Sequence, residues 1–219
     1  MTGWSIVLPV KRLDQAKSRL RATLAAGRAP VAGNDWHAAV TLAMALDTVA
    51  AVLATPRVAR VIVVTDDPVA TGSLAAIGAV CLPDAPAAGL NPALRHGAGS
   101  VSGSGLVGVA ALGADLPALR SDELNAALAA TERLATRAFV ADAAGTGTTL
   151  LAAPAGWALD PAYGPGSASA HANGGATPLV DPWPSLRQDV DTAADLAAAR
   201  LLGLGPRTAA LVGVTAAAG

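Results

Sequence analysis

The sequence predicts an α/β fold in which a mostly parallel, mixed β-sheet is covered by helices on both faces. Short apolar runs rich in Val, Ile and Leu alternate along the chain with longer segments of helical pattern, an arrangement typical of βαβ units. The run VARVIVVTDD, residues 58–67, is apolar at successive positions, as expected for a strand that is buried on both faces. The length of 219 residues predicts a single domain over residues 1–219.

The elements can be assigned in chain order. A strand is expected at residues 4–10, and a helix at 35–54, with Asn34 or Asp35 as its N-cap and Pro56 just beyond its end. In sheets of this class ligands bind beyond the carboxyl ends of the strands, so the residues at which strands stop are the candidate site. The later strands are expected at 58–67, 79–82, 105–117, 137–143, 148–154 and ending within 186–191, and the later helices at 90–101, 121–135 and 192–202.

Composition excludes several classes of protein. A hydrophobic fraction of 53% and a charged fraction of 14% are typical of a globular chain, and the net charge of −1 favours neither nucleic acid nor an anionic membrane as partner. Cys81 is the only cysteine, which excludes an internal disulfide and a cysteine-based zinc site. With no basic and apolar leader, a cytoplasmic protein is expected. The apolar run 38–54 contains Asp47 and is too short for a comfortable membrane span.

Basic residues are concentrated directly after the first strand. Lys11, Arg12, Lys17 and Arg19 lie within nine positions, in a chain that has 15 Lys and Arg in all. On a loop that leads into a helix, Lys11, Lys17 and nearby backbone amides could surround a polyphosphate. The alternative is a solvated basic face of a helix, which is the usual environment of Lys and Arg.

Acidic residues follow other strands. Asp66 and Asp67 end the strand 58–67, where a carboxylate could contact a base or a ribose, or cap the next helix. Asp115 follows a long apolar run, a position suited to Mg²⁺, although an Asp-x-Pro segment also forms turns. In an extended chain Asp189 and Asp191 would point to one face, and two adjacent like charges favour a bound cation. These three acids, Asp115, Asp189 and Asp191, are therefore candidate ligands of one or two Mg²⁺ ions bridging phosphates, although Asp191 or Thr192 could instead cap a helix.

Two glycine-rich loops offer backbone amides and hydroxyls. They are GTGTT, residues 145–149, and YGPGSASAHANGG, residues 163–175, in which Ser167 is expected near the first turn of a helix. The alternative is a pair of tight turns, and each loop taken alone favours that alternative. The segment GSGLVG, residues 103–108, matches a dinucleotide fingerprint but precedes an apolar strand, so we interpret it as a turn.

Together these segments resemble one family. LPVKRLDQAKSRL, VVTDD, GLNPALRHGA, GADLPAL, GTGTTLL, YGPGSASAHA and DVDTAADLAAARLLGLGPRT occur in the order and at about the spacing of the 2-phospho-L-lactate / phosphoenolpyruvate guanylyltransferases of deazaflavin coenzyme biosynthesis. The resemblance covers nearly the whole chain. It implies a nucleotidyltransferase fold, similar to glycosyltransferase-A-like and Rossmann-like sheets, and transfer of GMP from GTP to a phosphorylated three-carbon acid with release of pyrophosphate. The product would pass to the next enzyme of the pathway.

The resemblance also implies residue roles. Asp115, Asp189 and Asp191 would hold Mg²⁺, with Asp115 and Lys17 acting in catalysis. The acceptor would contact Thr149, Gly164 and Ser167. The nucleotide would lie near Lys11, Lys17, Asp66, Asn91 and Arg95. In this chain Tyr163 stands where the family usually has Phe. The family often has a charged or polar residue in the run before GTGT, which here reads ADAAGTGTT, and we assign no role to Asp142.

The acceptor stays open at this point. 2-Phospho-L-lactate, phosphoenolpyruvate and 3-phosphoglycerate differ by a few atoms, and no residue of the sequence distinguishes them. The Ala-rich composition is typical of a high-GC genome, and for bacteria of that kind the resemblance implies phosphoenolpyruvate as the acceptor. A guanylyl- or cytidylyltransferase acting on another phosphorylated acceptor, such as a molybdopterin, is the alternative within the enzyme class. A dinucleotide-binding redox domain and a non-catalytic nucleotide-binding regulator are alternatives from other classes.

Overall fold

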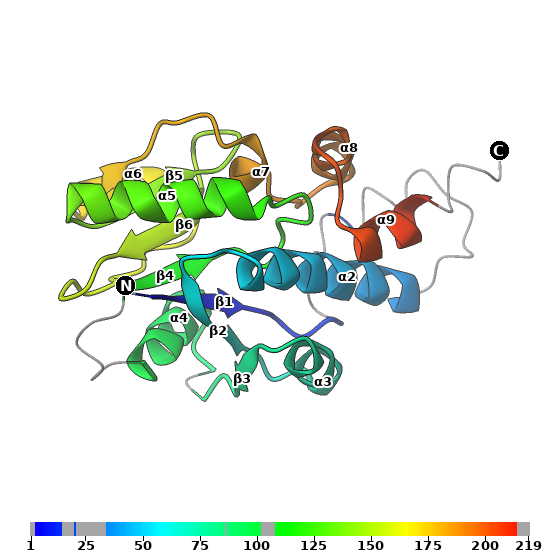
Figure 1. Cartoon of the computed structure of the whole chain (residues 1–219). Coiled ribbons are helices and arrows are strands. Elements are labelled where there is room, and N and C mark those ends of the chain that lie inside the picture. Colours follow the sequence, from blue (N-terminus) through cyan, green and yellow to red (C-terminus); the bar gives the residue numbers. More distant parts are fainter. Residues whose placement is uncertain (1–2, 15–19, 21–33, 86, 102–107, 214–219) are drawn as a thin grey trace.

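The fold is built on one seven-stranded sheet with the strand order β3-β2-β1-β4-β6-β5-β7 (Figure 1). The computed structural model describes residues 3–14, 20, 34–85, 87–101 and 108–213. In chain order the strands are β1 (Trp4–Pro9), β2 (Val58–Val64), β3 (Val80–Leu82), β4 (Gly108–Leu112), β5 (Ala138–Ala141), β6 (Thr148–Ala153) and β7 (Thr177–Pro178).

One strand runs against the others. β1 pairs in parallel with β2 and β4, β2 with β3, and β5 with β7, whereas β6 is antiparallel to both β4 and β5. The turn between β5 and β6 therefore lies at the edge of the sheet where β1 and β4 end. This reversal brings the GTGTT segment to the carboxyl edge, where ligands of such sheets bind.

Helices cover both faces of the sheet, as the alternation of elements predicted. Successive residues of a strand point to opposite faces, so Ile6 and Leu8 pack with α2, α3 and α5, whereas Val7 packs with α4 and α6. In Figure 1, α5 on the left and α2 on the right cover successive parts of one face. The helices are α2 (Asn34–Leu53), α3 (Pro68–Ala76), α4 (Leu90–Gly99), α5 (Ser121–Leu134), α6 (Ser167–Asn173), α7 (Pro184–Arg187), α8 (Ala193–Leu202) and α9 (Pro206–Gly213).

Helix α2 is long and apolar enough, by length and composition, to cross a membrane, but in this fold it is a core helix. More than half of the stretch Trp36–Leu53 is buried inside the protein. The acidic residue of that stretch, Asp47, is 5% exposed and accepts hydrogen bonds from the backbone amides of Arg207 (3.2 Å) and Thr208 (2.7 Å) at the start of α9. Asp47 thus satisfies two amides that a helix N-terminus leaves unpaired, and it attaches α9 to α2.

Two of the expected elements are wrong in detail. Residues 184–187 form α7, and residues 188–191 after it are not a strand. Asn34 and Asp35, expected as caps, already lie within α2. The helix appears at α7 because the Glu123 carboxylate of α5 accepts the amides of Ser185 (2.9 Å) and Leu186 (3.1 Å), a long-range contact that local pattern does not reveal.

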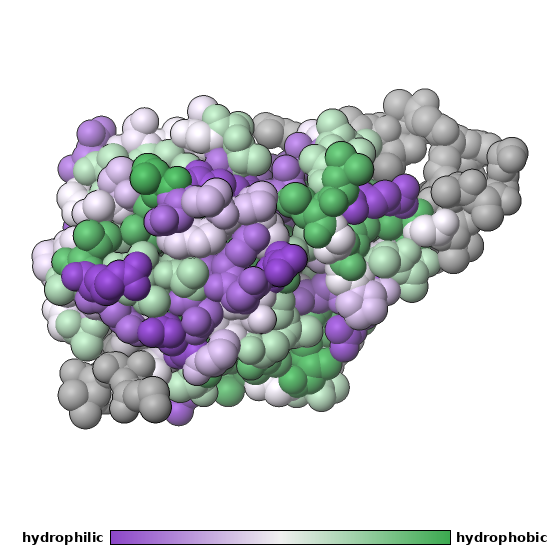
Figure 2. Space-filling model, turned by 45° about the horizontal axis from the view of Figure 1, so that its top comes forward, coloured by the Kyte–Doolittle hydropathy of each residue, from purple (hydrophilic) through white to green (hydrophobic). Residues whose placement is uncertain are grey.

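Polar and apolar residues are interspersed on the outer surface. Figure 2, viewed with the top of Figure 1 turned forward, shows hydrophilic residues across the middle of this face and hydrophobic residues in separate smaller groups around them. Large exposed hydrophobic side chains in the described part of the chain come from different elements: Val69, Val80, Leu134, Trp157, Val180 and Leu201.

Candidate active site

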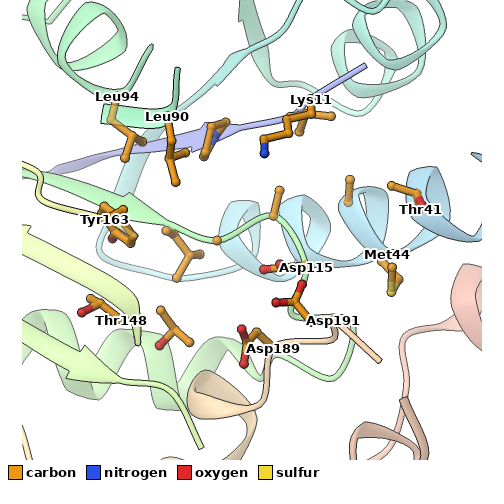
Figure 3. A pocket seen from close by; sticks show the side chains of 17 residues that line it. Lys11, Thr41, Met44, Leu90, Leu94, Asp115, Thr148, Tyr163, Asp189 and Asp191 are labelled. Atoms are coloured by element: carbon orange, nitrogen blue, oxygen red, sulfur yellow. The ribbon is translucent and has the colours of Figure 1, made fainter. Parts of the chain in front are cut away.

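A cavity of about 430 Å³ lies at the carboxyl edge of the sheet, where β1 and β4 end and β6 begins (Figure 3). One part of it carries carboxylates and a lysine, and another carries leucines, hydroxyls and a tyrosine. The lining residues are Pro9, Val10, Lys11, Thr41, Met44, Ala45, Leu90, Leu94, Leu112, Gly113, Ala114, Asp115, Thr148, Thr149, Tyr163, Asp189 and Asp191.

Five residues predicted for the site come together in this lining: Lys11, Thr149 and the three acids Asp115, Asp189 and Asp191. In Figure 3 the acids gather on one side and Lys11 comes from the end of β1 across from them. The residues reach the cavity from four separate parts of the chain. This arrangement lets one ligand contact cationic and anionic groups together.

The position of Asp115 depends on the glycine two residues before it. A Cβ added to Gly113 would lie 2.6 Å from Asp115 Oδ1, closer than real contacts allow. The amide of Gly113 donates to the Thr149 carbonyl at 3.0 Å, which continues the pairing of β4 with β6 past the end of β4. The absence of a side chain at Gly113 therefore gives the Asp115 carboxylate its space.

Asp189 and Asp191 reach the cavity from the loop after α7. Between them, Val190 is fully buried in a cluster that includes Met44 of α2, and its amide donates to the Asp115 carbonyl at 3.0 Å. Thr192 caps α8 in a reciprocal arrangement with Asp195, so the helix cap does not require the Asp191 carboxylate. Burial of Val190, and not the alternation of a strand, therefore sends both neighbouring carboxylates toward Asp115.

These acids supply the oxygen ligands that Mg²⁺ prefers, although they do not by themselves form a complete coordination shell. Within the described residues, no three His, Cys, Asp or Glu side chains are grouped closely enough to hold a metal ion by themselves. Mg²⁺ usually keeps several waters and binds through one or two carboxylates together with substrate phosphates. The residues present fit an ion of that kind, bound together with a nucleotide.

Asp67 supports the loop that carries Lys11. Its side chain, 6% exposed, accepts the amide of Leu13 at one oxygen and the amides of Val69 and Ala70 at the other, each at 2.9 Å. Burial raises the pKa of this carboxyl group, but the three amide hydrogen bonds, together with the positive charge of Arg12, outweigh burial and hold the pKa below 3.8. Asp67 is thus the N-cap of α3 and also ties the basic loop to the end of β2.

Replacing Asp67 with asparagine should keep the N-cap of α3, because an amide oxygen can still accept there, but should lose the hydrogen bond to the Leu13 amide. The new amide nitrogen would face the Leu13 N–H, so we expect the free energy of unfolding to fall by about 1–3 kcal/mol. The folded-state pKa is lowered, so the stabilisation exists above pH 3.8 and is lost as the pH falls through the folded pKa. Denaturant titrations from pH 3 to pH 7 should show the gap between wild type and variant closing at the acidic end.

The matched control is Asp14→Asn, the same exchange at an exposed carboxylate of the same loop, paired only with Arg12 in the bonds the structure records. We expect less than about 0.5 kcal/mol for it. Equal losses in the two variants would contradict the role given to Asp67.

Other predicted residues lie outside the lining. Asn91 Nδ2 donates to the Tyr163 carbonyl (2.9 Å) and its Oδ1 accepts the Tyr163 amide (2.8 Å), while Arg95 Nη1 donates to the Pro161 carbonyl (3.4 Å). Asp66 is exposed and accepts the amide of Asp84 (2.9 Å).

The remaining site predictions fall on the second glycine-rich loop and on the first basic segment. Gly164 precedes α6, and Ser167 is its first residue and is buried, as expected for the first turn. Neither lines the cavity. Lys17 and Arg19 lie outside the described residues, as does most of the segment 103–108.

Sequence reasoning missed Thr148 and Tyr163. The pairing of β5 with β6 slips by one residue between Val140 and Ala141, so that Thr149 is an extra residue in β6. Such bulges turn side chains and are frequent beside active sites. The Thr149 hydroxyl faces the Val140 carbonyl (3.4 Å), whereas Thr148 hydrogen-bonds to His171 of α6. A threonine pair at the start of a strand was the available signal, but the bulge itself has no sequence signature here.

Tyr163 closes the apolar part of the cavity. Its hydroxyl donates to the Ala111 carbonyl at 3.0 Å. Burial raises the pKa of the Tyr163 phenol far above its usual value, and the negative charge of Asp115 raises it further. The side chain is therefore a neutral wall of the cavity, fixed to β4.

The turn between β5 and β6 is held by Asp142. Its two oxygens accept the amides of Thr146 (2.9 Å) and Gly147 (2.8 Å). The residue to which the sequence assigned no role therefore orders the segment that leads into Thr148.

Comparison with known proteins identifies the family. The chain is 55% identical over 214 residues to a phosphoenolpyruvate guanylyltransferase from Salinispora arenicola, covering 97% of this chain and 95% of that protein. It is 54% identical over 211 residues to the protein of the same name from Geodermatophilus obscurus, covering 96% and 94%. No protein-family model matches the chain.

Solved structures agree on the fold. A putative nucleotide-diphospho-sugar transferase from Desulfovibrio desulfuricans superimposes with a TM-score of 0.73 at 19% identity, covering 99% of this chain and 96% of the other. A nucleotidyl transferase from Methanothermobacter gives a TM-score of 0.65 at 20% identity, covering 92% and 98%. Identity of about half over nearly the full length, together with this fold, shows that the chain is a nucleotidyltransferase and belongs to the phosphoenolpyruvate guanylyltransferase family.

Proposed function

We propose that this enzyme transfers GMP from GTP to the phosphate of phosphoenolpyruvate and releases pyrophosphate, in the cytoplasm, as a step of deazaflavin coenzyme biosynthesis. The observation that carries the proposal is one cavity in which Lys11 lies across from Asp115, Asp189 and Asp191. The chain is also about half identical to proteins named phosphoenolpyruvate guanylyltransferase. A nucleoside triphosphate needs cationic and metal-binding groups together, and the cavity offers both.

The reaction is a displacement at phosphorus. A phosphate oxygen of the acid attacks the α-phosphorus of GTP, the bond from the α-phosphorus to the bridging α–β oxygen breaks, and pyrophosphate departs with the electron pair. The attacking phosphate is already an anion at neutral pH, so no side chain has to remove a proton from it. This agrees with the absence of histidine from the lining residues in the described part of the chain. The enzyme has to bring two anions together and align them.

The main obstacle to the reaction is the repulsion between the two anionic substrates, and two groups of lining residues are proposed to reduce it. Asp115, Asp189 and Asp191 would hold Mg²⁺, which when bound neutralises phosphate oxygens and aligns the two substrates. Lys11 lies where it can bind the leaving phosphates, and Lys17 is proposed to join it. Asp67 keeps the Lys11 loop attached to the sheet through the Leu13 amide.

The substrates are proposed to occupy different parts of the cavity. We assign the acid to the part lined by Thr148 and Thr149, next to the β5–β6 turn. Gly164 and Ser167, near the start of α6 and outside the lining, are proposed as more distant contributors to its binding. The nucleotide is assigned to the side of Lys11, with Asp66, Asn91 and Arg95 as more distant contributors. The bonds of Asn91 and Arg95 to residues 161–163 give them a positioning role for the wall that holds Tyr163.

The test is pyrophosphate release from GTP and Mg²⁺ with phosphoenolpyruvate, with 2-phospho-L-lactate, with 3-phosphoglycerate and with no acceptor. We expect release that depends on phosphoenolpyruvate and on the metal. If pyrophosphate is released only with one of the other two acids, that acid is the acceptor in place of phosphoenolpyruvate. If none supports release, the assay is repeated with the next enzyme of the pathway and a deazaflavin acceptor to draw off the product, and a second failure would refute the proposed function.

A further inference from the structure

His171 holds the Thr148 side chain from behind the cavity wall. The imidazole is 3% exposed, and its Nδ1 lies 2.9 Å from Thr148 Oγ1. Thr148 lines the cavity, whereas His171 does not. Because of the bulge in β6, Thr148 is the residue turned toward α6, so the contact joins the cavity wall to the helix after the second glycine-rich loop.

The hydrogen bonds of the ring determine which nitrogen carries the proton. The backbone N–H of Ala162 donates to His171 Nε2 at 3.0 Å, and a backbone amide can only donate. Nε2 is therefore an acceptor without a proton. In the neutral ring the proton then sits on Nδ1, which donates to Thr148 Oγ1.

This tautomer sets the direction of the next hydrogen bond. With Oγ1 accepting from His171, the Thr148 hydroxyl keeps its own proton to donate. In the described part of the chain the recorded hydrogen bond of this hydroxyl is the one to His171. Thr148 is thus a donor at the cavity wall, and anionic oxygens accept hydrogen bonds.

We propose that His171, as its neutral Nδ1–H tautomer, holds the Thr148 hydroxyl as a hydrogen-bond donor to an anionic oxygen of the acid substrate. The inference rests on the proposed function for the identity of that substrate. His171 is a positioning residue because it acts through Thr148, and Thr148 makes the contact.

The surroundings of His171 favour the neutral ring. The ring packs near Phe139 of β5 and edge-on to Tyr163. Burial lowers the pKa of His171, the nearby positive charge of Arg137 lowers it further, and Asp160 raises it in part. Arg137 pairs with Asp160 at 3.0 Å and also donates to the Gly174 carbonyl. A proton on Nε2 would face the Ala162 N–H and break the contact that holds the segment before Tyr163.

The tautomer can be measured without any activity. In ¹⁵N-labelled protein at pH 7, His171 should show a pyridine-type nitrogen at Nε2 and a pyrrole-type nitrogen at Nδ1. The chain has three histidines, and the signals missing from His171→Gln assign the ring. A proton on Nε2, or a doubly protonated ring at pH 7, would overturn the proposal.

A pair of variants distinguishes positioning of Thr148 from general packing. Asparagine can return a donor near the place of Nδ1 but cannot reach the Ala162 amide. Glutamine can return an acceptor near the place of Nε2 but has no donor for Thr148. We expect His171→Gln to raise KM for phosphoenolpyruvate about tenfold with KM for GTP unchanged, and His171→Asn to stay within about threefold of wild type.

Thr148→Val, which removes the hydroxyl at constant shape, should show the same selective rise in KM for the acid, and Thr148→Ser should largely restore it. If His171→Gln behaves as wild type while His171→Asn is impaired, the ring serves only to anchor Ala162 and the inference is wrong. Equal rises in KM for acid and for GTP would also refute it.

A binding measurement separates this inference from the proposed function. Phosphoenolpyruvate is added to labelled wild-type protein with Mg²⁺, and the His171 Nδ1 signal is followed. A shift without turnover, in the coupled assay as well as in the direct one, would refute the proposed reaction and leave the inference standing. Turnover, or saturation with phosphoenolpyruvate, without any shift of that signal would overturn the inference.

Discussion

Replacing Asp189 with asparagine is expected to lower kcat by about 10³-fold while the protein still folds. Asparagine keeps the size of the side chain but removes the negative charge that a divalent cation requires. The backbone of Asp189 is held separately, since its amide donates to the Arg187 carbonyl (3.2 Å) and its carbonyl accepts from Gln188 Nε2 (3.0 Å). Steady-state pyrophosphate release measures kcat, and circular dichroism with thermal melting checks the fold.

Asp181→Asn is the matched control for Asp189. Asp181 is an exposed carboxylate in the segment before α7, and it is not part of the cavity lining. We expect kcat and Tm of this variant to stay at wild-type values. A normal kcat in Asp189→Asn would remove the metal-binding role given to the acids. Raising the Mg²⁺ concentration should recover part of the lost rate if the defect is in metal affinity.

Replacing Gly113 with alanine is expected to lower kcat by about tenfold to a hundredfold, although residue 113 carries no functional group. The new Cβ would lie 2.6 Å from Asp115 Oδ1 and would force the carboxylate to turn away from its position. Misplacement of a catalytic group by about 1 Å can cost about a hundredfold in rate. The measurement is kcat as a function of Mg²⁺ concentration, with Tm as the test of folding.

Gly72→Ala is the control: it makes the same exchange at a position where the new Cβ has no close neighbour. Gly72 lies inside α3, and a Cβ there would meet no atom within 4 Å. Alanine favours a helix interior over glycine, so this variant should be more stable by up to about 1 kcal/mol with unchanged kcat. If Gly113→Ala were as active as Gly72→Ala, the Asp115 carboxylate would not depend on the space at residue 113.

Much of the fold follows from local pattern. The apolar runs around Ile6, Val63 and Ala110 became β1, β2 and β4, paired in parallel as predicted, because strands buried on both faces need apolar residues at successive positions. The helices α2, α4, α5 and α8 also lie within a few residues of the expected ranges. In each of these segments the residues that determine the element lie inside it.

The expectations that differed from the structure depended on partners far away in the chain. Residues 184–187 became helical because Glu123, some sixty residues earlier, accepts their free amides. Asp189 and Asp191 were selected on the assumption of a strand, yet they reach the cavity because Val190 is buried between them. The sequence was enough to select these acids by residue type, whereas their position at the cavity depends on tertiary packing.

The sequence by itself determined the fold class, the parallel half of the sheet and the residue types of the cavity, including Lys11 and the three acids. These properties are encoded in hydrophobic period and in the position of polar residues at strand ends. Only the tertiary structure decided that Thr148 is the threonine joined to His171, that Asp67 holds the Leu13 amide, and that Gly113 makes room for Asp115. The reason is physical: a bulge, a buried carboxylate and a missing Cβ act through contacts between elements, and such contacts exist only once the sheet and its helices have assembled.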